Sequence, residues 1–191
     1  MTLKSREAIV LFTKSQQNIA KDFWNHFENQ VLPILPELRK SVNYSDAHEM
    51  NIIVADEPLH QKITGLIDFG DVVYSETINE LAIACAYGMM HVPDPVTAAC
   101  NILKGYHEIF EVEEIELNVL LGLITARLLI TVSNSAQSNI ENPTNSYNRI
   151  SEQAAWHLLE ELHKINSDYI HYRFRAACGM KPHPFHQDFL F

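Results

Sequence analysis

Two short stretches decide how this chain is interpreted: residues 44–51, which read YSDAHEMN, and residues 67–71, which read IDFGD. Each stretch lies beside a short run of residues that favour β-strands, residues 51–55 (NIIVA) and residues 62–68 (KITGLID). The residues between the two runs include Asp56-Glu57-Pro58, a sequence typical of a turn. The pattern therefore predicts a small β-hairpin with an acidic loop at each end.

The acidic residues at these ends have the spacing that kinase-type phosphoryl transfer needs. Such a reaction uses a carboxylate to orient or deprotonate the attacking hydroxyl, and oxygen ligands to hold magnesium beside the nucleotide phosphates. Asp46 and Asn51 can supply the base and one ligand, and Asp68 can hold the metal from the paired strand. The competing interpretation is a surface hairpin in which Asp and Asn only form turns.

The rest of the chain has helical periodicity, so the expected fold is mostly α with a small β-hairpin insert. Asp94 followed by Pro95 is a typical helix start, and Gly179 is typical of a helix end. Loops are expected at residues 142–146 and a tail without regular structure at residues 181–191. The predicted helices cover residues 6–28, 76–90, 94–110, 113–138, 151–162 and a last segment that ends near Cys178.

Composition narrows the function classes. The 191 residues are 47% hydrophobic, which argues for a folded protein. The formal charge of -10 argues against nucleic-acid binding and loosely for a cationic ligand. The most apolar stretch, residues 117–132, is interrupted by polar residues and predicts a buried helix and no membrane span. Three widely spaced cysteines predict small core residues in a reducing, cytoplasmic compartment.

With these motifs in place, the chain resembles the aminoglycoside phosphotransferase and choline kinase superfamily, over about residues 32–182. It is most similar to the branch that contains hydroxylysine kinase and kinase-like domains fused to class III aminotransferases. The stretches that carry this narrower similarity are residues 72–75 (VVYS), 79–84 (NELAIA), 127–136 (RLLITVSNSA), 141–143 (ENP), 155–159 (AWHLL) and 173–179 (RFRAACG).

The resemblance implies a role for each matching residue. Asp46 matches the catalytic base, Asn51 and Asp68 match the two magnesium ligands, and Phe69 and Gly70 match the packing and turn positions that follow. It also implies ATP and Mg²⁺ as cofactors, a C-terminal lobe of the protein-kinase-like α+β fold, and a small acceptor with an amine and a hydroxyl.

Four neighbouring residues are candidates for substrate contact or for support of the site. Tyr44 stands where the family usually has His, and is expected to support the loop. His48 either contacts substrate or metal or supports the loop. Asp71 is either a further acidic group of the site or a cap, and Glu80 either binds a substrate amine or serves as a cap or salt-bridge partner.

Other conspicuous side chains are expected to be structural. Arg127 lies in an apolar helix and needs a carboxylate partner if it is buried. Four aromatic residues at helical spacing could line a pocket, but the expected place for them is the core. Two histidines, His183 and His186, are placed in the tail. The aromatic residues are Tyr74, Tyr87, Tyr147 and Trp156.

A kinase of this type also needs a β-rich lobe with a Gly-rich loop and a strand Lys paired with a helix Glu. The first forty residues contain no Gly, and their lysines lack strand context. We therefore expect a truncated arrangement: an N-terminal helical segment (1–30), a C-lobe (31–180) and the tail. Activity of the chain alone is expected to be weak or absent, and a separate N-lobe or a second copy is expected to cover the lobe interface. The alternative is a non-catalytic remnant that acts by binding or oligomerisation.

Overall fold

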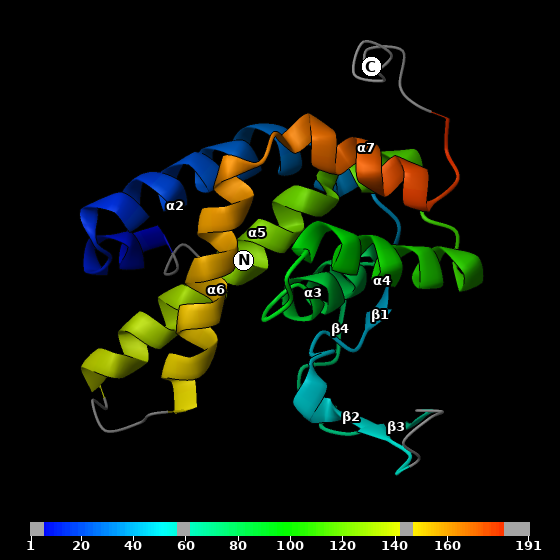
Figure 1. Ribbon diagram of the computed structural model, residues 1–191, viewed down its shortest axis with the longest axis horizontal. Coiled ribbons are helices and arrows are strands. Elements are labelled where there is room, and N and C mark those ends of the chain that lie inside the picture. The colour runs from blue at the N-terminus through cyan, green and yellow to red at the C-terminus, as the bar shows by residue number, and fades with distance from the viewer. Residues whose placement is uncertain (1–5, 57–61, 142–146, 182–191) are drawn as a thin grey trace.

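A computed structural model describes residues 6–56, 62–141 and 147–181, with the side chains of residues 147–150 also left undescribed. Helices dominate, as predicted, and the long helix α5 (Glu114–Glu141) is central to their packing (Figure 1). Four helices contact α5, and α4 packs against α3 and α7. The contacting helices are α2 (Lys14–His26), α3 (Ile78–Gly88), α6 (Tyr147–Lys164) and α7 (Ser167–Ala177), and α4 covers Pro95–Ile109.

Helix α5 contains the most apolar stretch of the chain. By length and composition it could cross a membrane, but 67% of its most apolar 18-residue window is buried inside the protein. Leu120, Ile124 and Leu128 are completely buried against neighbouring helices. The prediction of a buried core helix is confirmed, and this burial is typical of a soluble protein.

The N-terminal segment is not the single helix that we predicted. A short 3-10 turn, η1 (Ala8–Leu11), ends at Phe12, and α2 begins after Thr13. Thr13 and Gln16 form a capping box, in which the Thr13 hydroxyl accepts from the Gln16 N–H and the Gln16 side chain accepts from the Thr13 N–H. This reciprocal pairing starts a new helix within the apolar periodicity. A π-helical turn, η2 (Phe27–Val31), then leads to the proline-rich connection with its 3-10 turn η3 (Leu35–Glu37).

The predicted helix ends are mostly confirmed. Asp94 caps α4 with Pro95 in its first turn. Gly179, with a φ of 66°, donates to the Ala176 carbonyl while Met180 donates to the Arg175 carbonyl, which is a Schellman motif. Helix α6 begins at Tyr147, four residues before the predicted start at Ser151. The predicted loop 142–146, the turn residues Glu57 and Pro58, and the tail from residue 182 lie outside the described residues.

The strands form two separate antiparallel pairs. Strands β2 (Ile52–Val54) and β3 (Ile63–Leu66) form the predicted hairpin, with Ile52 opposite Leu66. The second pair joins β1 (Lys40–Asn43) to β4 (Val73–Glu76). The prediction of continuous helix after Gly70 is wrong at β4, because a partner strand that is distant in sequence leaves no local turn signal.

The β1–β4 pair is fixed to the helical core just before the candidate loop. Arg39 donates from Nε and Nη2 to the two carboxylate oxygens of buried Glu116 on α5, at 3.0 and 2.5 Å. Buried Asn43 donates from Nδ2 to the Ser75 hydroxyl and the Glu76 carbonyl, each at 2.8 Å. These bonds therefore fix the backbone that precedes Tyr44, the first residue of the loop.

Two of the three cysteines lie in the core, as predicted. Cys85 and Cys100 are buried, Cys178 is half-buried, and all three are free thiols. Burial raises the pKa of the Cys178 thiol to about 11, and burial raises the pKa of Cys100 as well. These thiols are therefore protonated at neutral pH, as expected of inert core residues.

Candidate active site

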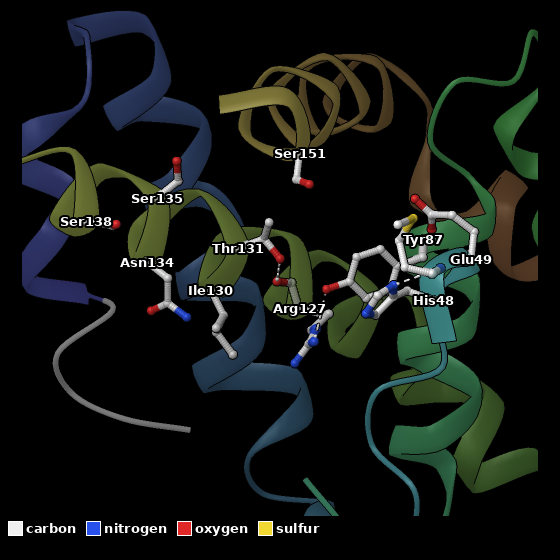
Figure 2. Close-up of a pocket in the computed structure, with 11 residues that line it drawn as sticks. His48, Glu49, Tyr87, Arg127, Ile130, Thr131, Asn134, Ser135, Ser138 and Ser151 are labelled. Carbon is white, nitrogen blue, oxygen red and sulfur yellow. Dashed lines mark hydrogen bonds between the residues drawn. The ribbon is translucent and has the colours of Figure 1, made fainter. Parts of the chain in front are cut away.

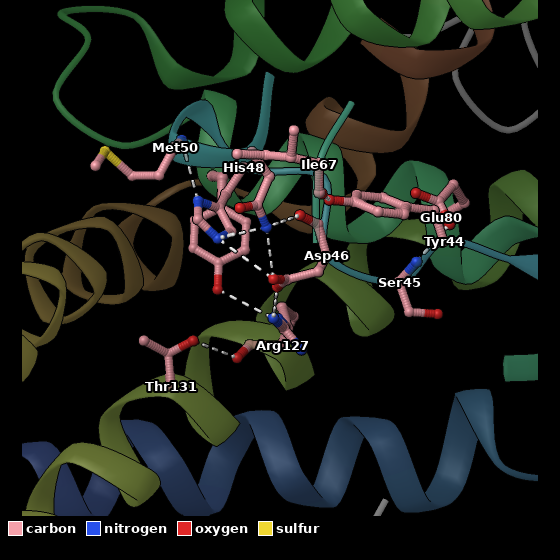
Figure 3. Close-up of polar contacts among 11 residues, drawn as sticks. Tyr44, Ser45, Asp46, His48, Met50, Ile67, Glu80, Arg127 and Thr131 are labelled. Carbon is pink, nitrogen blue, oxygen red and sulfur yellow. Dashed lines mark hydrogen bonds and ion pairs between the residues drawn. The ribbon is translucent and has the colours of Figure 1, made fainter. Parts of the chain in front are cut away.

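Asp46 lies between His48 of its own loop and Arg127 of α5 (Figure 3), and it is hydrogen-bonded to Asn51. The Asn51 amide donates from Nδ2 to the Asp46 carboxylate at 2.8 Å and to the Asp46 main-chain carbonyl at 3.2 Å. A single 3-10 turn, η4 (Glu49–Asn51), closes the loop and brings the two side chains together. Asn51 is buried and Asp46 is half-buried, so the pair is held at the edge of the domain with one side open to solvent.

His48 supports this turn and also contacts the carboxylate. Its Nδ1 accepts a hydrogen bond from the Met50 N–H at 3.2 Å, so His48 caps η4. Its Nε2 lies 3.1 Å from Asn51 Nδ2 and 3.4 Å from Asp46 Oδ2, so the ring packs against both members of the Asp–Asn pair. These are the contacts expected of a loop-supporting residue, and the alternative role in contacting substrate or metal stays a prediction.

Asp68 follows directly from the hairpin that carries Asn51. The Ile67 N–H donates to the Asn51 carbonyl at 3.1 Å and extends the β2–β3 pairing by one step. Asp68 is the next residue and has a φ of 58°, in the left-handed region that Asp tolerates better than most residues. Its Oδ1 accepts from the Gly70 N–H at 3.3 Å, which fixes the carboxylate beside the turn.

The oxygens of Asn51 and Asp68 have the chemistry that a hard cation requires. No described residue donates to Asn51 Oδ1, since its Nδ2 makes the contacts to Asp46. Amide and carboxylate oxygens are suitable ligands for Mg²⁺, which usually keeps waters or substrate phosphates for its remaining positions. Within residues 6–56, 62–141 and 147–181 there is no group of three or more His, Cys, Asp or Glu side chains that could hold a metal. Asn51 and Asp68 are therefore oxygen donors that could contribute to a site for a hard cation.

Tyr44 connects the two stretches that opened the sequence analysis. Its hydroxyl donates to the Ile67 carbonyl, and its ring packs edge-on against Phe69 at 5.2 Å between centroids. Partial burial raises the pKa of the Tyr44 phenol, and the negative charges of Asp46 and Asp68 raise it further. Tyr44 thus makes the contacts expected of a loop-supporting residue.

Glu80 and Asp71 have different surroundings. Glu80, in the first turn of α3, accepts from the Ser45 N–H at 2.8 Å and holds the backbone beside Asp46. This contact is neither a helix cap nor a salt bridge, and a role for Glu80 in binding a substrate amine stays a prediction. Asp71 is exposed and has no hydrogen bond or ion pair with another described residue. It does not cap a helix, because the next element is strand β4.

Two residues of the site were expected to be structural. Arg127 on α5 places Nη2 3.4 Å from Asp46 Oδ1 and donates to the Tyr87 hydroxyl at 3.0 Å. Its guanidinium also lies over the Tyr87 ring, 5.4 Å from the centroid. The sequence signalled only that Arg127 would need a carboxylate. It could not identify Asp46 as that carboxylate, because the two residues are 81 positions apart.

Of the other aromatic residues, one lies in the core as predicted and one does not. Trp156 is buried and packs edge-on against Phe12, as expected of a core residue. Tyr74 is 68% exposed, so its predicted place in the core is wrong. A position on a two-stranded ribbon leaves one face open to solvent, which helical spacing could not reveal. The side chain of Tyr147 and both tail histidines, His183 and His186, lie outside the described residues.

A paired Asp and Asn, followed by a hairpin and then by Asp-Phe-Gly, resembles the arrangement at the site of a phosphotransferase. The sequence profile of the phosphotransferase enzyme family matches residues 4–113, more than half of the chain, and the chain belongs to this family. The predicted resemblance is therefore confirmed.

Curated relatives agree with this assignment. The chain is 29% identical over 164 residues to the hydroxylysine kinase of Danio rerio, covering 84% of this chain and 46% of that protein. It is 29% identical over 163 residues to the hydroxylysine kinase of Xenopus laevis, covering 81% and 43%. The Mus musculus hydroxylysine kinase is 28% identical over 145 residues, covering 71% and 38%. The chain spans less than half the length of these relatives, and no solved structure matches it.

Proposed function

We propose that this chain carries the acceptor and magnesium side of a kinase that phosphorylates a hydroxyl on a small, amine-bearing molecule. In this reaction the acceptor oxygen bonds to the γ-phosphorus of ATP, the bond from that phosphorus to the β–γ bridging oxygen breaks, and ADP leaves. The observation that carries the proposal is the joining of Asp46 to Asn51 at 2.8 Å, with Asp68 one residue beyond the ladder contact of Asn51.

Each residue has a distinct task in this proposal. Asp46 accepts the proton of the attacking hydroxyl, and the Asn51 amide and His48 ring hold its carboxylate in place. Asn51 Oδ1 and the Asp68 carboxylate are the proposed magnesium ligands. Magnesium, when bound with the nucleotide, would neutralise charge on the phosphates. Tyr44 and Glu80 position the loop through the Ile67 carbonyl and the Ser45 N–H.

In the protein-kinase-like fold, a helical C-lobe carries these residues and a β-rich lobe grips the nucleotide. We propose that the described helices and hairpin correspond to the C-lobe. No glycine precedes Gly65, so a Gly-rich phosphate loop is absent from the sequence before the site. Because magnesium would then make most of the contacts to the ATP phosphates, we expect the purified chain to transfer the phosphoryl group slowly.

The test is phosphoryl transfer from radiolabelled ATP by the purified chain with magnesium, across a panel that includes hydroxylysine, amino alcohols and an aminoglycoside. We expect slow transfer to at least one amine-bearing acceptor, and a loss of about 100-fold or more in Asp46→Asn, because the general base is removed. Asp56→Asn, on the exposed end of the hairpin, is the matched control and should retain the wild-type rate. Absence of both transfer and Mg·ATP binding would contradict the proposal.

A second candidate function is supported by the apolar surface around the hairpin. Both two-stranded sheets leave every strand with an unpaired edge, and many of their large apolar side chains face solvent. Such a surface tends to associate with another polypeptide. We therefore also consider a non-catalytic role in which this face, which we call the hairpin face, binds a second copy of the chain. The name hairpin face covers exposed apolar side chains on both sides of the two strand pairs and in the segment after β3. These are Val42, Ile53, Val54, Ile63, Leu66, Ile67, Phe69, Val73 and Tyr74, all at least 44% exposed.

A further inference from the structure

A cavity of about 390 Å³ opens beside the candidate active site (Figure 2). Its walls come from the loop that carries His48 and Glu49, from Tyr87 on α3, and from one face of α5 together with the start of α6. Arg127 lies in this wall beside neutral polar side chains such as Thr131 and Asn134. The cavity therefore has a mixed polar and apolar lining and a size suited to a small metabolite, and Arg127 connects it to Asp46.

Arg127 has hydrogen-bonding capacity that its surroundings do not use. A guanidinium has five N–H donors and a permanent positive charge. Nη2 contacts the Tyr87 hydroxyl at 3.0 Å and the Asp46 carboxylate at a long 3.4 Å. Nε is buried and has no hydrogen-bond partner among the described residues. The Arg127 side chain is 26% exposed and lines the cavity, so its accessible N–H groups can donate to a ligand that supplies acceptor oxygens.

We propose that Arg127 binds the carboxylate of the acceptor, so that the site selects hydroxy amino acids over amino alcohols and aminoglycosides. The proposal rests on the proposed function and identifies its substrate class. A carboxylate matches the planar fork of a guanidinium and forms charge-assisted hydrogen bonds with it. Glu49, an acidic residue in the cavity wall, offers a counter-charge for the amino group of such a zwitterion.

The same contact makes Arg127 a positioning residue for Asp46. In the structure the guanidinium touches the carboxylate that we assign as the base, at a distance too long for a strong hydrogen bond. A substrate carboxylate on Arg127 would provide a better partner and leave Asp46 Oδ1 for the acceptor hydroxyl. Binding of the correct acceptor would thus place its hydroxyl near the base and release the base from Arg127 in one event.

The test measures binding by calorimetry, without nucleotide, so that it does not depend on phosphoryl transfer. The probes are 5-hydroxylysine and its carboxamide, which differ in the negative charge at one end. We expect the wild-type chain to bind the carboxylate form about tenfold or more tightly. Arg127→Gln should bind both probes equally, and Arg127→Lys should keep part of the preference. Arg173→Gln is the matched control, because Arg173 pairs with Thr97 and Tyr169, which do not line the cavity.

Each outcome has a defined meaning. Equal binding of both probes to the wild-type chain, or no binding of either, overturns the proposal without using any variant. A preference that survives in folded Arg127→Gln, as checked by circular dichroism, also overturns it. If the preference depends on Arg127 but no acceptor is phosphorylated, the proposed function fails while the carboxylate site stands. If transfer occurs equally to acid and amide, the function stands and the role of Arg127 is wrong.

Discussion

Asp46 receives contacts from residues that are distant in sequence as well as from its own loop. Asn51 and His48 reach it from the next turn, and Arg127 reaches it from the middle of α5. The local contacts follow from the spacing of YSDAHEMN, because one 3-10 turn brings Asn51 back to Asp46, five residues earlier. The contact with Arg127 depends on how the hairpin sits against α5.

Tyr44 provides a prediction at the residue scale. Tyr44→Phe removes the hydrogen bond to the Ile67 carbonyl but keeps the ring contact with Phe69. We expect faster amide exchange across residues 44–51 and 66–70, with little change in the melting temperature, because the bond joins two loops rather than core elements. Hydrogen-exchange mass spectrometry provides the measurement.

The matched control is Tyr74→Phe. Tyr74 is 68% exposed and has no hydrogen bond with a described residue, so this variant should exchange like the wild type. Unchanged protection in Tyr44→Phe would show that Tyr44 does not hold the loop to the Asp68 turn.

At the scale of elements, the start of α4 predicts a dependence on pH. Asp94 accepts from the Thr97 N–H at 3.0 Å and from the Thr97 hydroxyl at 2.6 Å. These hydrogen bonds from Thr97 lower the pKa of the Asp94 carboxyl. A carboxyl with a lower pKa in the folded state stabilises the fold above its unfolded pKa, near pH 4, and loses that contribution as the pH falls through the folded pKa.

We therefore expect Asp94→Ala to lower the free energy of unfolding by about 1 kcal/mol at pH 7. The difference from wild type should shrink below about pH 4, where the carboxylate becomes protonated. Urea denaturation at pH 7 and pH 3 measures both effects. Asn at position 94 can also cap the helix but does not titrate. The difference in free energy of unfolding between Asp94→Asn and wild type should therefore shrink or change sign in acid. An Asp94→Ala effect that is equal at both pH values would contradict this assignment.

The close packing of α5 against η2 predicts that a methyl group added at Gly122 lowers stability. A Cβ on Gly122 would lie 2.4 Å from Val31 Cγ2, and Val31 is completely buried with a stiff β-branched side chain. We expect Gly122→Ala to lower the free energy of unfolding by about 1–3 kcal/mol, although Ala favours helix over Gly by about 1 kcal/mol.

Gly105 supplies the control for helix propensity alone. It lies in α4, and a Cβ there would meet no atom within 4 Å. Gly105→Ala should therefore raise stability by up to about 1 kcal/mol in the same denaturation experiment. A Gly122→Ala variant as stable as wild type would show that η2 shifts freely away from α5.

At the scale of the whole molecule, the hairpin face predicts association. Val42 and Ile63, on strands with unpaired edges, are 70% and 69% exposed, and Phe69, after β3, is 63% exposed. We expect light scattering to show concentration-dependent association of the purified chain through this face. Val42→Lys with Ile63→Lys should shift the chain to monomer, because charges on edge strands oppose strand pairing.

Ile109→Lys is the control for this experiment. Ile109 is 91% exposed but ends α4 and lies outside the hairpin face, so the substitution should leave association unchanged. A wild-type chain that remains monomeric at all concentrations would contradict both the association and the second candidate function.

The sequence by itself determined the features that depend on neighbours in the chain. The capped start of α4, the end of α7 at Gly179, the β2–β3 hairpin and the meeting of Asp46 with Asn51 each follow from local spacing, and local hydrogen bonds fix them. The family also followed, because its motifs are short and occur in order.

Only the tertiary structure decided the features that depend on contacts between distant segments. No local turn signal predicts the β1–β4 pairing, because the two strands are distant in sequence. Arg127 contacts Asp46 only because α5 packs beside the loop. The break at Thr13 is local by contrast: its capping box joins Thr13 to Gln16, and the prediction missed it because the apolar periodicity continues across it. Local hydrogen bonds and turn geometry are encoded within a few residues, whereas long-range pairing is selected by burial and charge across the whole fold.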